Sequence, residues 1–244
     1  WSIFAYAHAV QTSTPELAAA FGRYNPEVKV FGNAAFDLPP FPQGSFAPKI
    51  FYGALARGDF PARMARSLAP VLAAHPDASF EVVGDRGVFD ALPTANKRFH
   101  PLMPYEAYLD LMGTCSVLLT PLEGDHYETK SDTKFLDAAS RGLVTIASPA
   151  AYGATVRHGD NGLIADGLAD WAPLVARVLG DPQASGEMAH RAWAYVRDHR
   201  MFGHQIAARR DWYAGLMARR EALNAGVVSR LPGLAALLAA EPKT

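Results

Sequence analysis

The sequence predicts an α/β protein with a doubly wound parallel sheet of the Rossmann-like kind and a helical extension at its C-terminus. Three observations carry this prediction. The chain has 244 residues, a length that suits one large α/β unit with appendages. Through its middle, short β-rich or apolar runs alternate with segments of helical spacing, which is typical of βαβ units. These runs show little polar alternation, as expected of strands covered on both faces.

The first 45 residues are expected to form a helix and a linker outside the sheet domain. A hydroxyl cap at Ser13 or Thr14 and a proline at position 15 mark the start of a short helix. Prolines, glycines and aromatic residues dominate residues 31–48, and this composition sustains neither a helix nor a central strand. We therefore place the linker in that segment.

Residues 46–200 are expected to form the sheet domain. The runs that predict strands are 49–55, 80–83, 116–120 and 143–147. The segments that predict helices are 61–74, 104–112, 132–140, 171–179 and 183–198. Parallel strands joined by right-handed crossovers bring their carboxyl ends to one edge of the sheet, where ligands bind in such folds. The loops that follow strands are therefore the candidate site.

Residues 201–244 are expected to be C-terminal helices. Helical spacing covers 204–223, after a break at Gly203, and an Ala/Leu-rich helix is predicted at 231–240. The arginines of this region are expected to form solvated faces. We expect the last helix to pack against a partner or another domain rather than to carry chemistry.

Composition excludes several classes of protein. There are 23 Lys and Arg against 24 Asp and Glu, which argues against a basic nucleic-acid binder. The single cysteine, Cys115, excludes an internal disulfide or a Cys-rich zinc site and suits a reducing compartment. No apolar run reaches the roughly 18 residues of a membrane span, and no signal peptide is recognisable. We expect a cytoplasmic protein. Peripheral association at the inner face of a membrane is the alternative.

Two loops of the sheet domain could contact a ligand. In residues 53–59, Gly53 permits close backbone approach and Arg57 could meet an anion, although a surface role for Arg57 is the alternative. The loop matches neither the dinucleotide fingerprint nor the P-loop. Residues 99–104 hold prolines on both sides of Leu102, so their extended backbone could contact a flat ring edge, or could simply connect to the next helix.

The segment 121–137 carries the most candidate ligands. Ser131 is placed to cap the next helix, whose N-terminus would offer N–H donors and a partial positive charge to an anion. Lys130 and Lys134 flank that helix start and suit a diphosphate. Asp137 could accept hydrogen bonds from a diol draped over the helix end. The alternative is a capped helix with exposed charges.

The sequence of residues 130–148, with Tyr152 and residues 159–164, resembles the C-terminal nucleotide-sugar-binding domain of GT-B fold glycosyltransferases of the family 4 type. The resemblance covers about residues 26–196. It implies that residues 1–45 are the end of the N-terminal acceptor lobe plus a linker. Because the chain opens on Trp1 rather than Met, we expect it to be part of a longer polypeptide that holds the missing lobe.

The resemblance implies roles for individual residues. Asp137 matches the second acid of the E-x7-E motif, which binds the ribose hydroxyls. The first acid of that motif falls on Thr129, with Glu128 beside it, so the chain departs from the pattern there. Arg57 resembles the basic residue of the loop after the first strand. Its usual lysine partner is missing, which leaves Lys134 or Lys130 to share the charge of the diphosphate.

Two further groups of residues follow from the resemblance. His100, Pro101 and Leu102 match the loop that contacts the base. The phosphate-cradling helix start is matched by three successive residues, Ser131, Asp132 and Thr133. Two histidines, His126 in the polar loop and His8 near the acceptor lobe, are further candidates, with a structural role as the alternative for each.

The activity that the resemblance implies is hexosyl transfer in glycan biosynthesis. The donor would be a UDP- or GDP-linked sugar, and the acceptor a glycan, lipid or protein. Retention of configuration is expected, with Arg57 and Lys134 as the catalytic residues. Neither a cofactor nor a metal is expected, because the sequence has no His/Asp/Glu cluster at metal-ligand spacing. The fragment by itself need not be active.

Other functions stay open at the level of the sequence. A nucleotide-sugar epimerase would use the same nucleotide pocket but needs acids and bases around the sugar. A non-catalytic binding or scaffolding domain is favoured by Thr129 and by the missing lysine. A phospho-acceptor signalling domain is disfavoured, because no pair of acids follows the first strand of the sheet domain.

Overall fold

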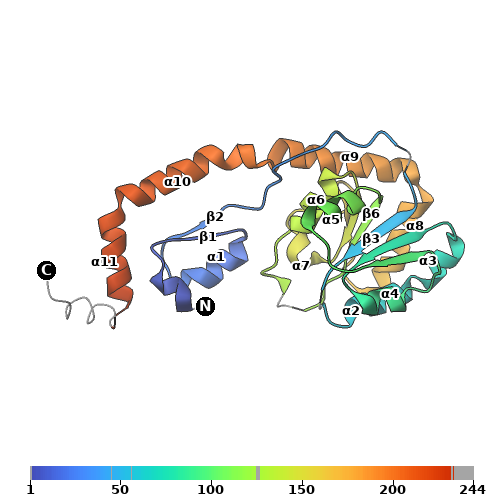
Figure 1. Ribbon diagram of the computed structural model, residues 1–244, viewed down its shortest axis with the longest axis horizontal. Helices are drawn as coiled ribbons and strands as arrows, with labels where there is room; N and C mark the ends of the chain where they lie inside the picture. The colour runs from blue at the N-terminus through green and yellow to red at the C-terminus, as the bar shows by residue number, and fades with distance from the viewer. Residues whose placement is uncertain (1, 45, 56, 125–126, 232, 234–244) are drawn as a thin grey trace. The chain divides into compact units, whose positions relative to one another are not determined.

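The computed structural model describes residues 2–44, 46–55, 57–124, 127–231 and 233. Contacts divide the chain into two compact units (Figure 1). The larger unit is Ala34–Met201, and the smaller combines both ends of the chain, Trp1–Asn33 with Phe202–Thr244. The segment expected to be a linker therefore belongs mostly to the sheet unit, and the two ends of the chain fold together.

The larger unit is built on a six-stranded sheet of order β5-β4-β3-β6-β7-β8, parallel throughout. Its strands are β3 (Lys49–Gly53), β4 (Ser79–Val83), β5 (Lys97–His100), β6 (Val117–Thr120), β7 (Val144–Ala147) and β8 (Leu163–Ile164). The order runs outward in one direction from β3 and in the other from β6. The point of reversal, where such sheets bind ligands, therefore lies between β3 and β6.

Helices cover both faces of this sheet. They are α2 (Phe60–Ser67), α3 (Ala69–Ala74), α4 (Arg86–Ala91), α5 (Tyr105–Met112), α6 (Thr133–Ser140), α7 (Pro149–Tyr152), α8 (Trp171–Gly180) and α9 (Pro182–His199). Successive residues of a strand point to opposite faces, so Ile50 packs in one apolar core and Phe51 in another. The predicted doubly wound α/β fold is confirmed.

Two local predictions were wrong, and one helix was not predicted. The helix predicted at 61–74 is two helices, α2 and α3, because Pro70 has no N–H to donate across the junction at Leu68. Residues 85–91 hold α4, whose first turn is capped by the Asp85 carboxylate accepting from Val88 N at 3.1 Å. His100 ends strand β5 rather than lying in a loop, because β4 supplies its pairing.

The proline-rich segment before β3 has no helix, as predicted, and it packs on α9. The Trp193 indole donates to the Pro39 carbonyl at 2.9 Å, and the Phe41 ring lies 5.0 Å from the His190 ring. Gly142, at a φ of 78°, makes room for Pro42, since a Cβ at that position would lie 2.7 Å from the proline Cδ.

The smaller unit combines a parallel pair of strands with helices from both ends of the chain. Its elements are η1 (Ser2–Tyr6), β1 (Val10–Thr12), α1 (Pro15–Gly22), β2 (Val28–Val30), η4 (Phe202–Gln205), α10 (Ile206–Ala218) and α11 (Arg220–Arg230). Thr14 caps α1 by accepting from Leu17 N at 3.1 Å, which confirms a predicted hydroxyl cap. The Arg219 guanidinium pairs with Glu27 at 2.7 Å and so joins the two ends of the chain.

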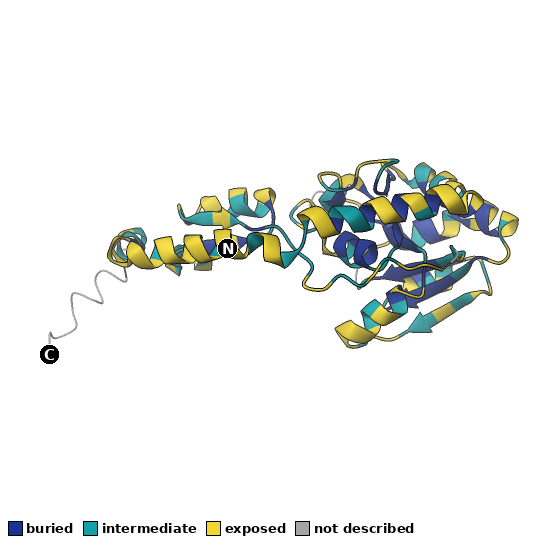
Figure 2. Ribbon diagram, turned by 90° about the horizontal axis from the view of Figure 1, so that it is seen from above, coloured by how far each residue is buried: buried dark blue, intermediate teal, exposed yellow. Residues whose placement is uncertain are grey.

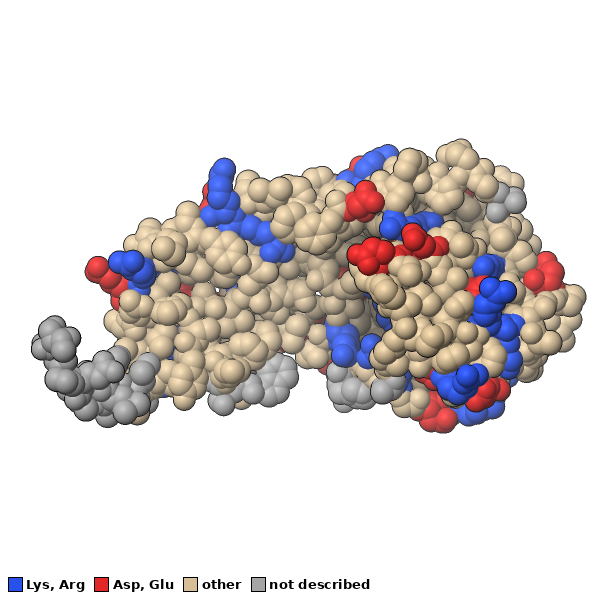
Figure 3. Space-filling model, viewed as in Figure 1, with Lys and Arg blue, Asp and Glu red and all other residues tan. Residues whose placement is uncertain are grey.

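The predicted helix at 204–223 is interrupted at Arg219, where α10 ends and α11 begins. No residue of α10 is buried, and Figure 2 shows the helix exposed or half-exposed along its length. The helix predicted at 231–240 lies almost entirely outside the described residues. Among the helices that are described, none is both long and apolar enough to cross a bilayer. Lys and Arg are interspersed with Asp and Glu over the visible face (Figure 3).

Candidate functional site

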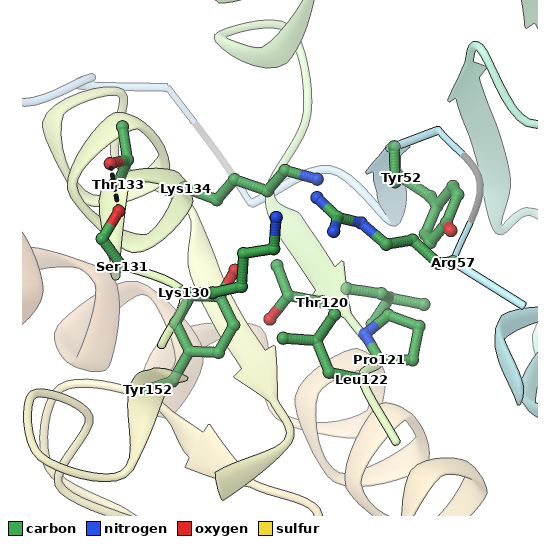
Figure 4. A pocket seen from close by; sticks show the side chains of 12 residues that line it. Tyr52, Arg57, Thr120, Pro121, Leu122, Lys130, Ser131, Thr133, Lys134 and Tyr152 are labelled. Carbon is green, nitrogen blue, oxygen red and sulfur yellow. Dashed lines mark hydrogen bonds between the residues drawn. The ribbon is translucent and has the colours of Figure 1, made fainter. Parts of the chain in front are cut away.

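A cavity of about 190 Å³ lies at the carboxyl ends of β3 and β6, beside the point where the strand order reverses (Figure 4). Its lining comes from β3, β6, α6, α7 and the loops after the strands. The lining residues are Tyr52, Ala54, Arg57, Leu119, Thr120, Pro121, Leu122, Lys130, Ser131, Thr133, Lys134 and Tyr152. A site at this edge of the sheet was predicted from the topology.

Three cationic side chains meet over this cavity. Arg57, Lys130 and Lys134 extend toward the same space from different parts of the chain (Figure 4). No carboxylate of the described residues forms an ion pair with any of them, and none of the described residues that line the cavity is an acid. The Nε of Arg57 is buried without a hydrogen-bond partner, and its guanidinium lies 5.6 Å from the centre of the Tyr127 ring. Like charges gathered without a counter-ion favour binding of an anion.

Lys134 is the most deeply placed of the three cations. Its ammonium group donates a hydrogen bond to the carbonyl of Gly53, the last residue of β3. Burial, together with the neighbouring charges of Arg57 and Lys130, lowers the pKa of Lys134 to about 8. Gly53 itself is required by packing, because a Cβ there would lie 2.7 Å from Cε2 of Tyr108.

The start of α6 differs from the prediction. Ser131 was expected to cap this helix, but the N-cap position is Asp132, whose side chain makes no capping hydrogen bond. The Asp132 carboxylate instead accepts from Arg200 Nη1 and from Thr155 Oγ1, each at 2.7 Å, because both groups are brought against it from later elements. Ser131 Oγ lies 3.1 Å from Thr133 Oγ1. The start of α6 lies next to the three cations, since Ser131, Thr133 and Lys134 also line the cavity.

Asp137 lies one turn beyond Lys134 on α6 and is not part of the cavity lining. Its Oδ1 accepts a hydrogen bond from the Tyr105 hydroxyl at 2.6 Å. Burial raises the pKa of Asp137, and the bond from Tyr105 and the charges of Arg141 and Lys134 oppose that rise only in part. The orientation of Asp137 is therefore set by a bond within the fold.

The predicted base-contacting residues lie at and beyond the end of β5, outside the cavity. His100 Nε2 is 2.5 Å from Oε2 of Glu81, whose other oxygen pairs with Lys49 at 2.9 Å. Burial raises the pKa of Glu81, but hydrogen bonds from Lys49 and His100 outweigh that effect and lower it. The His100 ring is therefore engaged by Glu81 within the fold. Pro101 and Leu102 are exposed beyond it.

Other predicted residues lie away from the cavity. Glu128 is exposed and Thr129 half-buried, and neither lines it. His8 belongs to the smaller unit, where its Nε2 is 2.7 Å from Oδ1 of Asn224. His126 lies outside the described residues. Across the part of the chain that is described, no three His, Cys, Asp or Glu side chains gather as a metal site requires.

Sequence reasoning missed several residues that line the cavity. Tyr52 and Thr120 lie at the ends of β3 and β6, and their places in predicted strands were the signal that could have found them. The Tyr52 hydroxyl donates to Asp85 at 3.1 Å, and burial raises its pKa. Tyr152 comes from α7, and burial raises its pKa to about 12.

Solved glycosyltransferases share this architecture. S. aureus TarM, in a complex with fondaparinux, alpha-GlcNAc-glycerol and UDP, is 10% identical with a TM-score of 0.66, over 84% of this chain and 44% of its own. Anabaena HepE with UDP and glucose is 14% identical with a TM-score of 0.64, over 84% of this chain and 63% of its own. The fold is that of glycosyltransferases.

A third similar structure is a single domain. It is the C-terminal domain of a glycosyl transferase group 1 family protein from Francisella tularensis, 13% identical with a TM-score of 0.53, over 63% of this chain and 86% of its own. No family model and no curated protein matches the sequence. This chain spans less than half the length of TarM.

Proposed function

We propose that this chain is the donor-binding part of a glycosyltransferase, corresponding to the C-terminal domain of a family 4 type enzyme, and that its cavity holds the diphosphate of a nucleotide sugar. The observation that carries the proposal is the convergence of Arg57, Lys130 and Lys134 over one cavity in a glycosyltransferase fold. A diphosphate would supply the missing negative charge. The UDP in the TarM and HepE structures supports this choice of ligand.

In the proposed binding mode, the diphosphate lies between the start of α6 and the side chains of Arg57 and Lys134. The Asp137 carboxylate accepts from the ribose hydroxyls. The backbone and apolar surface at Pro101 and Leu102 contact the base, since the His100 ring is already held by Glu81. A UDP- or GDP-linked hexose is the expected donor.

The chemistry follows from where charge develops. The bond between the anomeric carbon and the diphosphate oxygen breaks, and its electron pair stays on that oxygen. The acceptor oxygen bonds to the anomeric carbon, and its proton passes to an oxygen of the departing diphosphate. The Gly53 carbonyl holds Lys134 in place before the reaction. Lys134 and Arg57 stabilise the leaving diphosphate, a role that elsewhere a divalent cation can fill. We propose that the transfer retains configuration and needs no metal.

The acceptor is a glycan, lipid or protein, and we place its binding in the missing lobe of a longer polypeptide. Cys115 is a buried free thiol, which suits a reducing cytoplasm. We therefore place the reaction in the cytoplasm or at the inner face of its membrane.

A non-catalytic nucleotide-binding domain is the second candidate. None of the described residues lining the cavity has a carboxylate, and Thr129 stands where the motif has an acid. The same lack of an acid argues against an epimerase, which would need acids and bases around the sugar.

Calorimetric titration of the 244-residue chain with UDP, GDP, ADP and their sugar conjugates tests the proposal. One base should bind at micromolar affinity, and Asp137→Ala should cost about 1–3 kcal/mol of binding free energy because charge-assisted hydrogen bonds to ribose are lost. Asp211→Ala in α10 is the control and should bind as the unaltered chain does. Failure of all the nucleotides to bind would contradict the proposal.

Turnover separates the two candidates. Sugar transfer by the full enzyme, with its acceptor lobe present, supports a transferase. Arg57→Ala should then lower the turnover of the full enzyme more than it lowers nucleotide affinity, because the charge acts on the leaving group. Tight nucleotide binding without sugar transfer by the full enzyme would support the non-catalytic domain.

A further inference from the structure

We infer that Tyr105 is a positioning residue of the nucleotide site, whose hydroxyl holds the Asp137 carboxylate in the orientation that receives the ribose diol. The inference rests on the proposed function and extends it to a residue on α5 that no sequence motif indicates. The observation behind it is the 2.6 Å hydrogen bond from the Tyr105 hydroxyl to Oδ1 of Asp137, between residues 32 positions apart.

The bond leaves half of the carboxylate available. Tyr105 engages Oδ1, and no other described group donates to Asp137. A carboxylate held at one oxygen keeps its second oxygen for a ligand, in an orientation fixed before the ligand arrives. A vicinal diol could then bind without first ordering the side chain.

One face of the Tyr105 ring packs against a neighbouring aromatic ring, although the residue is 54% exposed. It stacks on Tyr108 with ring centres 6.4 Å apart and planes inclined by 15°. Tyr108 in turn meets Phe51 of β3 edge-on, with centres 5.1 Å apart, and covers Gly53. The row of rings Phe51, Tyr108 and Tyr105 therefore begins at the end of β3, where the Gly53 carbonyl also accepts from Lys134. One strand end thus fixes both the phosphate-binding cation and the partner of the ribose-binding acid.

Charges around Asp137 give the inference a second readout. The groups that face this carboxylate are Tyr105 and Tyr108 from α5, Lys134 from α6, Arg141 just after α6, and Tyr152 from α7. Burial raises the pKa of Asp137, and the Tyr105 hydrogen bond opposes that rise. Removing the hydroxyl should raise the pKa further, so affinity for a ribonucleotide should begin to fall at a higher pH on acidification.

The test is Tyr105→Phe in the 244-residue chain, titrated with UDP, GDP and ADP and with their 2′,3′-dideoxy counterparts. For the base that binds, the affinity of the ribonucleotide should fall about three- to tenfold, the usual worth of one hydrogen bond. The affinity of the dideoxy counterpart should not change, because it has no diol for Asp137. The loss of affinity on acidification should move to higher pH.

Tyr213→Phe is the matched control, since Tyr213 is 50% exposed and its hydroxyl bonds Gln11 at 2.8 Å in the other unit. It should bind every nucleotide as the unaltered chain does. Equal losses for ribo- and dideoxynucleotides in Tyr105→Phe, or no loss with an unshifted pH profile, would overturn the inference while leaving the proposed function intact. Absence of binding by the unaltered chain would overturn both.

Discussion

Two clusters of charge flank the start of α6, and they are built differently. On one side, Asp132 is buried and bonded to Arg200 and Thr155, so each charge has its partner within the fold. On the other side, Arg57, Lys130 and Lys134 face one cavity without a described carboxylate among the lining residues. Charges paired inside the fold stabilise structure, whereas charges left unpaired at a cavity are available for a ligand.

The difference matters because the two clusters lie within a few residues of each other in sequence. Asp132 and Lys134 are two positions apart, yet the first is turned to the C-terminal end of α9 and the second to the end of β3. We therefore expect substitutions in the first cluster to change stability, and substitutions in the second to change nucleotide binding. Four predictions test this division.

The largest effect is expected from Arg200→Ala. Removing the guanidinium leaves the buried Asp132 carboxylate without its partner, and breaking such a pair typically costs about 3–5 kcal/mol of unfolding free energy. Chemical denaturation monitored by circular dichroism measures the loss. Arg219→Ala breaks the exposed pair with Glu27 and is the control, which should change stability little. A loss of unfolding free energy no larger than that of the control would show that the Asp132 pair does not stabilise the fold.

Lys134→Met should lower nucleotide affinity by about 1.5–3 kcal/mol, because a charge-assisted hydrogen bond to phosphate is lost. Its stability should not fall, since the substitution removes a buried charge that faces two other cations. Lys97→Met is the matched control. The Lys97 ammonium donates to the carbonyls of Phe89 and Leu92 at 2.7 and 2.8 Å, so this variant should lose stability and keep its affinity.

The lowered pKa of Lys134, about 8, predicts how pH changes both the stability of the chain and its affinity for a diphosphate. Between pH 8 and about 10.4, the usual lysine value, the unfolded chain holds a proton that the folded chain has lost, so this group makes stability rise with pH there. Diphosphate affinity should fall through the same range. A bound diphosphate raises the pKa of Lys134. Binding at about half a pH unit above the pKa of the free site should therefore take up protons.

Proton uptake is measured by calorimetry in buffers of different ionisation enthalpy. Lys134→Met should abolish it, and Lys97→Met should not. Binding of the nucleotide without proton uptake in the unaltered chain would show that Lys134 does not meet the diphosphate.

The smallest effect is expected from Lys130→Ala. Lys130 is exposed, so water and salt screen its charge, and affinity should fall only about two- to fivefold. The dependence of affinity on salt should also become shallower. A loss of affinity as large as that of Lys134→Met would mean that the two lysines contribute equally to binding the diphosphate.

Much of the larger unit was predictable because its strands are apolar runs. The strands β3, β4, β6 and β7 and the helices α5, α6, α8 and α9 lie where the pattern of hydrophobic residues placed them. Strand β5 was missed because Lys97, Arg98 and His100 give it no apolar pattern, and it forms through pairing with β4. Helix α4 was missed because six residues are too few to show a helical period.

The sequence by itself determined the α/β fold and the edge of the sheet where a site would lie, because the hydrophobic period and the alternation of strands and helices along the chain are local properties. It also indicated Arg57, Lys130 and Lys134 as candidate anion ligands. Only the tertiary structure decided which polar groups are consumed by the fold. Asp132 is paired with Arg200 and His100 with Glu81, whereas Asp137 is held by Tyr105 at one oxygen only. These bonds join residues 68, 19 and 32 positions apart, and such partners meet only once the packing of helices and strands sets their distances.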